Sequence, residues 1–173
     1  MEGMSFLPRG DTENLVVLGL DLGTHCGYAL GAVGDARPVA SGVWHLKTDR
    51  WQGGGMRFLR LRRELDQLRR AMPGGNPLGA VYYEQVRAHK GVDAAHVYGG
   101  LLATVQTWCE EHEIAYGPVT VAAIKQAATG KGNTRKEAVE DACRARFGIV
   151  PSTDDEADAA WCWFCGCRKL REG

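Results

Sequence analysis

Four acidic residues stand where a carboxylate without a partner is costly. Asp21 ends the apolar run 15–21, and Glu84 interrupts the apolar stretch 79–86. Asp155 and Asp158 lie three residues apart in a predicted final helix, so both side chains face one side of it. Charged groups are seldom buried without a partner or a metal. Four converging carboxylates suit hard divalent cations such as Mg²⁺, which take oxygen ligands and keep part of their water.

Each acid also has a structural interpretation. Asp21 before Leu-Gly-Thr is typical of a turn, and Glu84 at a strand end is typical of an ion pair. Asp154, Asp155 and Asp158 would also serve as capping residues or as partners of the helix dipole. Asp154 competes with Asp155, because spacings of four and three both bring a side chain to Asp158. The four positions taken together, in this chain order, favour a shared metal site.

Hydrophobic patterning predicts elements that bring these acids together. Apolar runs predict strands at 15–21, 27–33, 38–46, 79–86 and 114–119. Helical spacing and capping signals predict helices at 56–72, 92–112, 120–128, 134–146 and 154–169. Short turns join the first three strands as an antiparallel meander, and later helical crossovers make the remaining pairs parallel. The pattern predicts one α/β domain over 15–173, with a five-stranded mixed sheet flanked by helices, behind a disordered tail at 1–14. The last helix is expected to pack across the neighbouring first and fourth strands.

Composition indicates an ordinary globular domain. The chain has 173 residues, of which 45% are hydrophobic and 24% charged. No apolar run approaches the roughly 20 residues of a membrane span, and the N-terminus has no signal-peptide core, so we expect a cytoplasmic protein without a membrane partner. Six cysteines are interpreted as reduced thiols. Cys162, Cys165 and Cys167 are spaced as in some zinc sites, but their aromatic run favours the core face of a helix over a four-ligand site.

The charge pattern has two interpretations. Net charge is zero, with 21 basic and 21 acidic residues, which argues against nucleic-acid binding unless the charges are segregated. Four carboxylates holding two divalent ions would bring the loaded protein to +4. Six arginines crowd the helix predicted at 56–72, where they form either a DNA-binding surface or a solvated helix face. They are Arg57, Arg60, Arg62, Arg63, Arg69 and Arg70.

From Leu15 to the last helix, the motifs resemble those of the RuvC family of Holliday junction resolvases. The shared motifs are, in chain order, Asp21-Leu-Gly-Thr with Gly27-Tyr28, Glu84-Gln-Val with Asp93 and Gly99 beyond it, Lys125-Gln before Gly130-Lys-Gly132, Lys136, and Asp155-Glu-Ala-Asp158. The resemblance implies an RNase H-like fold of the retroviral integrase superfamily. It also implies a homodimer, with the helix at 92–112 in the interface.

The resemblance further implies a magnesium-dependent endonuclease that resolves four-way DNA junctions by paired nicks, leaving 5′-phosphate and 3′-hydroxyl ends. Two Mg²⁺ ions would bind per active site, with Mn²⁺ as a substitute. The implied metal ligands are Asp21, Glu84, Asp155 and Asp158. The implied catalytic set adds Lys125 and Lys136 near the scissile phosphate. The implied DNA contacts are Arg87, Lys125, Lys131, Arg135 and Lys136. The partner is branched DNA, chiefly four-way junctions, in the cytoplasm of a bacterial or phage-infected cell.

One position departs from the family pattern. The family often has an aromatic wedge directly after Glu-Gln-Val, whereas this chain has Arg87. An arginine stacks on a base or holds a phosphate, but it is a poorer wedge. Arg87 therefore favours one alternative, a nuclease with relaxed specificity for flaps, forks or RNA–DNA hybrids. A sugar-kinase or actin-like ATPase shares the Asp-Leu-Gly-Thr motif but needs two such domains. A non-catalytic DNA-binding protein would not need the acids and lysines.

Overall fold

A single five-stranded sheet organises the chain. The computed structural model describes residues 12–72, 77–87 and 91–172. The strands are β1 (Val16–Asp21), β2 (His25–Ala32), β3 (Ala40–His45), β4 (Leu78–Gln85) and β5 (Ala115–Thr120), in the spatial order β3-β2-β1-β4-β5. The helices are α1 (Met56–Ala71), α2 (Val92–Glu111), α3 (Val121–Thr129), α4 (Lys136–Phe147) and α5 (Asp154–Glu172).

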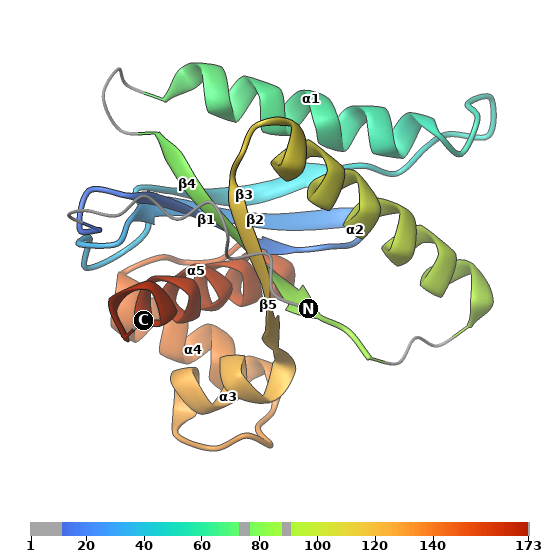
Figure 1. Cartoon of the computed structure of the whole chain (residues 1–173). Helices are drawn as coiled ribbons and strands as arrows, with labels where there is room; N and C mark the ends of the chain where they lie inside the picture. The colour runs from blue at the N-terminus through green and yellow to red at the C-terminus, as the bar shows by residue number, and fades with distance from the viewer. Residues whose placement is uncertain (1–11, 73–76, 88–90, 173) are drawn as a thin grey trace.

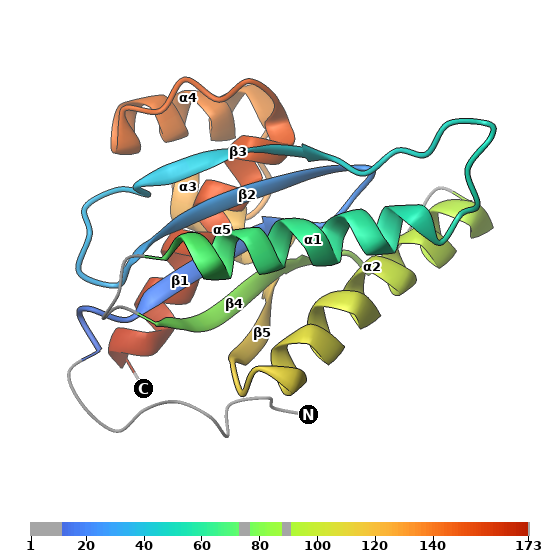
Figure 2. The same cartoon turned by 90° about the horizontal axis from the view of Figure 1, so that it is seen from above.

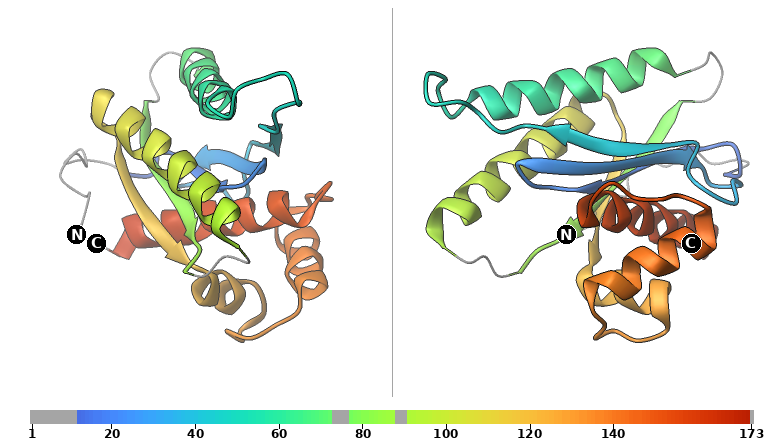
Figure 3. Two further views of the ribbon diagram at one scale, coloured as in Figure 1. Left: turned by 90° about the vertical axis from the view of Figure 1, so that its right-hand side faces the viewer. Right: turned by 180° about the vertical axis from the view of Figure 1, so that it is seen from behind.

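The sheet has the predicted mixed topology. β2 pairs antiparallel with both β1 and β3, whereas β4 lies parallel to β1 and β5 lies parallel to β4. The predicted neighbourhood of the first and fourth strands is therefore confirmed. Helices cover both faces, with α1 and α2 on one side and α5, α3 and α4 on the other (Figures 1 and 3). Each side holds its own apolar core.

Two glycines allow α5 to lie directly against the sheet. A Cβ atom at Gly19 of β1 would lie 2.4 Å from the backbone oxygen of Ala159. A Cβ atom at Gly27 of β2 would lie 1.9 Å from the backbone oxygen of Asp155. Any larger residue would push the helix away. α5 consequently lies mainly across β1 and β2, and it also contacts β4, whereas the sequence predicts packing across the first and fourth strands.

The aromatic run of α5 belongs to the core. Trp161, Trp163 and Cys162 are at most 2% exposed, and Cys165 and Cys167 are also buried. Burial raises the pKa of the Cys165 thiol to about 11 and that of Cys167 to about 12, which keeps both protonated at neutral pH. The prediction that this run forms a core face is confirmed. These thiols act as small apolar side chains there.

The last helix is longer than predicted, and part of the expected tail is described. Leu170 is buried, so α5 continues to Glu172 instead of ending near residue 169. Of the expected tail at 1–14, residues 1–11 lie outside the described residues. The carbonyl of Glu13 already accepts a hydrogen bond from the Gly34 N–H at 2.8 Å. Among the described helices, none is both long and apolar enough to cross a membrane.

Candidate active site

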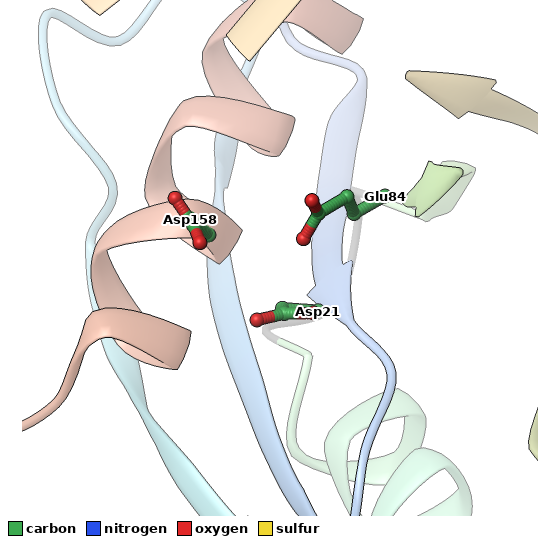
Figure 4. Close-up of side chains that lie close together, drawn as sticks. All are labelled: Asp21, Glu84 and Asp158. Carbon is green, nitrogen blue, oxygen red and sulfur yellow. The ribbon is translucent and has the colours of Figure 1, made fainter. Parts of the chain in front are cut away.

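Three carboxylates meet at the carboxyl edge of the sheet. Asp21 is the last residue of β1, and Glu84 is the penultimate residue of the parallel neighbour β4. Asp158 comes from the second turn of α5, which crosses this edge. One oxygen from each of the three lies within 4.8 Å of the others. Figure 4 shows the three carboxylates turned toward one another from three different elements.

A cavity of about 280 Å³ opens beside these carboxylates. Its lining combines the three acids with Lys125 of α3 and Lys136 of α4. Apolar side chains from the same helices, including Ile124 and Val139, close the remaining wall. The cavity therefore places acidic oxygens and two ammonium groups around one small volume.

The carboxylates of the cluster raise one another's pKa values, and the nearby lysines offset this effect only in part. Burial, followed by the charges of Glu84 and Asp158, raises the pKa of Asp21 well above its usual value. Burial and then Glu84 raise the pKa of Asp158 to about 7. Burial also raises the pKa of Glu84, although Asp21 and Lys136 oppose that shift. Buried carboxylates that repel one another are the donor set that a hard divalent cation satisfies, so the residues present fit such an ion.

Asp155 and Asp154 have different surroundings. Asp155 is half-buried, and its charge is among those that raise the pKa of Asp21, although it is not one of the three mutually close ligands. Asp154 instead forms an ion pair with Lys136, which lowers the pKa of Asp154. Both Asp154 and Lys136 line the cavity. Asp155 thus adjoins the carboxylate cluster, whereas Asp154 is occupied by an ammonium group.

The cap of α5 differs from the one expected at Asp154. The hydroxyl of Thr153 accepts the Glu156 N–H at 3.3 Å. The Asp154 carboxylate, besides pairing with Lys136, accepts hydrogen bonds from the N–H groups of residues 154 and 155. Glu156, 7% exposed, accepts hydrogen bonds from the Ser152 N–H at 2.8 Å and the Ser41 hydroxyl at 2.7 Å. This network fixes the start of α5 to β3 and so positions Asp155 and Asp158. Glu156 was not among the residues predicted from the sequence, although Thr-x-x-Glu is a capping signal.

The other predicted basic residues lie outside the cavity lining. Lys131 and Arg135 are exposed on the connection between α3 and α4. Arg87 is exposed after β4 and lines a second hollow of about 360 Å³, which shares Val121 with the first. The predicted site residues therefore form a central group of acids with Lys125 and Lys136, and an outer group of exposed cations near the same edge.

The mixed five-stranded sheet flanked by helices on both faces is that of an RNase H-like fold. No family model matches the sequence, and a search of curated proteins gives no match. Among solved structures, RuvC of Thermus thermophilus in complex with a Holliday junction substrate is similar, with a TM-score of 0.74, 26% identity, and coverage of 92% of this chain and 96% of that chain. A second Thermus thermophilus RuvC structure has a TM-score of 0.71 at 26% identity over 92% and 97% of the two chains.

A more distant structure agrees on the fold. The yeast mitochondrial Holliday junction resolvase Ydc2 has a TM-score of 0.51 at 14% identity, covering 95% of this chain and 84% of that chain. The resemblance to RuvC resolvases inferred from the motifs is therefore confirmed by structure, and so is the RNase H-like fold.

The raised pKa of Asp158 predicts how stability depends on pH. Its pKa rises from 3.8 to about 7, so the folded chain holds this proton more tightly than the unfolded chain. In EDTA, the free energy of unfolding should therefore fall as the pH rises through that interval. We expect the wild-type melting temperature to drop between about pH 5 and about pH 8 more than that of Asp158→Asn. If thermal melts show equal drops in melting temperature for the two proteins, the raised pKa of Asp158 is contradicted.

Proposed function

We propose that this protein is a magnesium-dependent endonuclease that resolves four-way DNA junctions by paired nicks, leaving 5′-phosphate and 3′-hydroxyl ends. The observation that carries the proposal is the convergence of Asp21, Glu84 and Asp158 within 4.8 Å. The fold around them matches over 92% of the chain a RuvC structure with a Holliday junction substrate. The proposed setting is the cytoplasm of a bacterial or phage-infected cell.

The proposed ligands and cations come from the residues around the cavity. Asp21, Glu84 and Asp158, joined by Asp155, would hold two Mg²⁺ ions, and Mn²⁺ would be accepted by the same oxygens. When bound, such ions orient the phosphate, lower the pKa of an attacking water and stabilise the leaving oxygen. Lys125 places a fixed positive charge at the cavity, where the phosphate gains negative charge in the transition state.

An ion pair with Asp154 positions Lys136 at the cavity. Its ammonium group pairs with that carboxylate at the cavity wall, and its side chain is 71% exposed. A DNA phosphate entering the cavity would compete with Asp154 for the ammonium group. The exposed Lys131, Arg135 and Arg87 would then contact neighbouring phosphates, which makes binding strongly dependent on salt.

Arg87 supports one second candidate, a nuclease of the same fold with relaxed specificity for branched DNA. The described end of β4 carries this exposed arginine where an aromatic wedge is expected. The two functions differ in substrate. We expect cleavage of a four-way junction in Mg²⁺, with slower cleavage of a flap, none of a linear duplex, and none of any substrate in EDTA. Faster cleavage of the flap would favour the second candidate, and full activity in EDTA would refute both.

Assembly provides a further prediction. The first turns of α2 are exposed from Val92 to His96, with Val92 itself 68% exposed. A four-way junction has two-fold symmetry, so a two-fold dimer through α2 would place one active site on each of two strands. Light scattering at micromolar concentration should give twice the 18.8 kDa of one chain. An active protein of 18.8 kDa would contradict a dimeric enzyme.

A further inference from the structure

The segment between β3 and α1 presents an exposed tryptophan. Trp51 is 82% exposed, and it is the one exposed Phe, Tyr or Trp among residues 12–72, 77–87 and 91–172. The guanidinium of Arg50 lies 4.5 Å from the centre of its ring. An indole in water forgoes the burial of a large apolar surface, so its exposure in a folded segment calls for an explanation.

Hydrogen bonds hold this segment in a defined conformation. The Trp51 N–H donates to the Asp49 carboxylate at 2.9 Å, which forms a local turn. Arg57 of α1 donates to the Gly54 carbonyl at 3.0 Å. Arg60 of α1 donates to the Gln52 side chain at 2.7 Å and also to the carbonyl of Lys47. These contacts fix the loop while they leave the indole outside.

The same contacts revise the interpretation of the arginine-rich helix. Arg57 and Arg60 hold the loop, and Arg62 forms an ion pair with Glu111 of α2. Half of the six arginines therefore have partners within the protein. The loop with Arg50 and Trp51 lies beyond the N-terminus of this helix.

The loop leaves the sheet at the edge that carries the acids. β3 and β1 both pair antiparallel with β2, so they run in the same direction. The Leu46 N–H, just after β3, donates at 2.8 Å to the carbonyl of Thr24, in the turn that follows Asp21. Figure 2 shows the loop and the N-terminal end of α2 projecting beyond this edge. Trp51 is thus on the side of the molecule from which DNA would reach the cavity.

We infer that Trp51, with Arg50, forms a stacking contact for an unstacked base near the branch point of DNA bound in the active site. This inference rests on the proposed function. Aromatic rings beside cations bind nucleic acid by stacking on a base face while the cation meets the phosphate. A continuous duplex hides its base faces, whereas a branch point exposes them. The contact would also supply the aromatic group that the position of Arg87 lacks.

Binding measurements with substitutions of Trp51 test the inference. In Ca²⁺, to suppress cleavage, Trp51→Ala should bind a four-way junction about tenfold more weakly than wild type, and Trp51→Phe should keep most of the affinity. Binding to a linear duplex of equal length should change little. The matched control is Val39→Ala, which truncates another exposed apolar residue, 71% exposed, at the opposite edge of the sheet. Melting temperatures confirm that each variant is folded.

Tryptophan fluorescence gives an independent measure. The other four tryptophans, Trp44, Trp108, Trp161 and Trp163, are at most 9% exposed. Emission that acrylamide quenches therefore comes mainly from Trp51, and Trp51→Phe should lack it. A saturating four-way junction should protect this emission. Protection that depends on protein concentration without DNA would instead assign Trp51 to a protein contact and overturn the inference.

The remaining outcomes are distinguishable. Wild-type protein that fails to bind a junction would refute the proposed function and the inference together. If wild type binds the junction normally, two results would refute the inference alone. One is that Trp51→Ala binds the junction as tightly as Val39→Ala does. The other is that acrylamide quenches Trp51 fully even with the junction bound. Equal losses on junction and duplex would also refute it, because they would indicate a backbone contact common to both substrates.

Discussion

Asp21→Asn should lower the rate of junction cleavage in Mg²⁺ on the order of 100- to 1,000-fold, with junction binding unchanged or tighter. Asp21 belongs to the carboxylate cluster with Glu84 and Asp158, so an ion held there loses a charged ligand. Removing one negative charge also lessens repulsion of the DNA phosphates, which is why affinity should not fall. In EDTA the variant should melt above wild type, because a costly buried charge is gone.

Single-turnover cleavage and gel-shift binding, measured side by side, check this expectation. Glu84→Gln should behave in the same way. Asp141→Asn is a matched control, since that carboxylate is exposed on α4 and pairs with Arg144 of the same helix. Loss of both cleavage and binding in Asp21→Asn and Glu84→Gln would assign the two acids a structural role. Unimpaired cleavage would remove them from the active site.

Asp155→Asn should lose cleavage by about 100-fold or more, whereas Asp154→Asn should stay within about tenfold of wild type. Asp155 adjoins the cluster closely enough for its charge to raise the pKa of Asp21, which makes it the candidate for the fourth ligand. Asp154 is engaged by Lys136 at the surface of the cavity. An exposed ion pair contributes at most about 1 kcal/mol, and asparagine retains an oxygen for the helix N-terminus, so Asp154→Asn should melt only slightly lower.

The two variants serve as controls for each other, because they differ by one position on the same turn. Cleavage rates, thermal melts and the rise in melting temperature on adding Mg²⁺ should all be recorded. Asp155→Asn should show a smaller Mg²⁺-dependent rise than Asp154→Asn. If Asp154→Asn is inactive and Asp155→Asn is active, Asp154 is the metal ligand. The metal would then displace Lys136 from its ion pair with Asp154.

The sequence predicts the elements of this fold well because the strands and helices leave clear patterns of apolar residues, either as continuous runs or at helical spacing. The run before Asp21 and the strand containing Glu84 are apolar, and their chain order already makes them parallel neighbours, as the pairing of β1 with β4 confirms. The helical spacing of α1 and the aromatic run of α5 likewise follow from one-dimensional patterns. Element bounds differ by three residues or fewer, as at the end of α5.

Contacts between distant residues could not be predicted in the same way. The ion pair of Lys136 with Asp154 joins two helices, and the bond from Ser41 to Glu156 spans 115 residues. Neither has a periodic signal. The exposure of Trp51 could not be predicted either, because it depends on which arginines of α1 contact the preceding loop. Tertiary packing thus decides which of several similar side chains serve the site.

A supercoiled plasmid carrying an extruded cruciform tests the central claim most directly. Paired nicks placed across the four-way junction at the cruciform base convert the circle to linear DNA, and ends with 5′-phosphate and 3′-hydroxyl can be resealed by DNA ligase. We predict ligatable linear product in Mg²⁺, little nicked circle, no reaction in EDTA, and no reaction with a plasmid that lacks the inverted repeat. Cleavage in EDTA, or equal nicking of the plasmid without the inverted repeat, would contradict a metal-dependent junction resolvase.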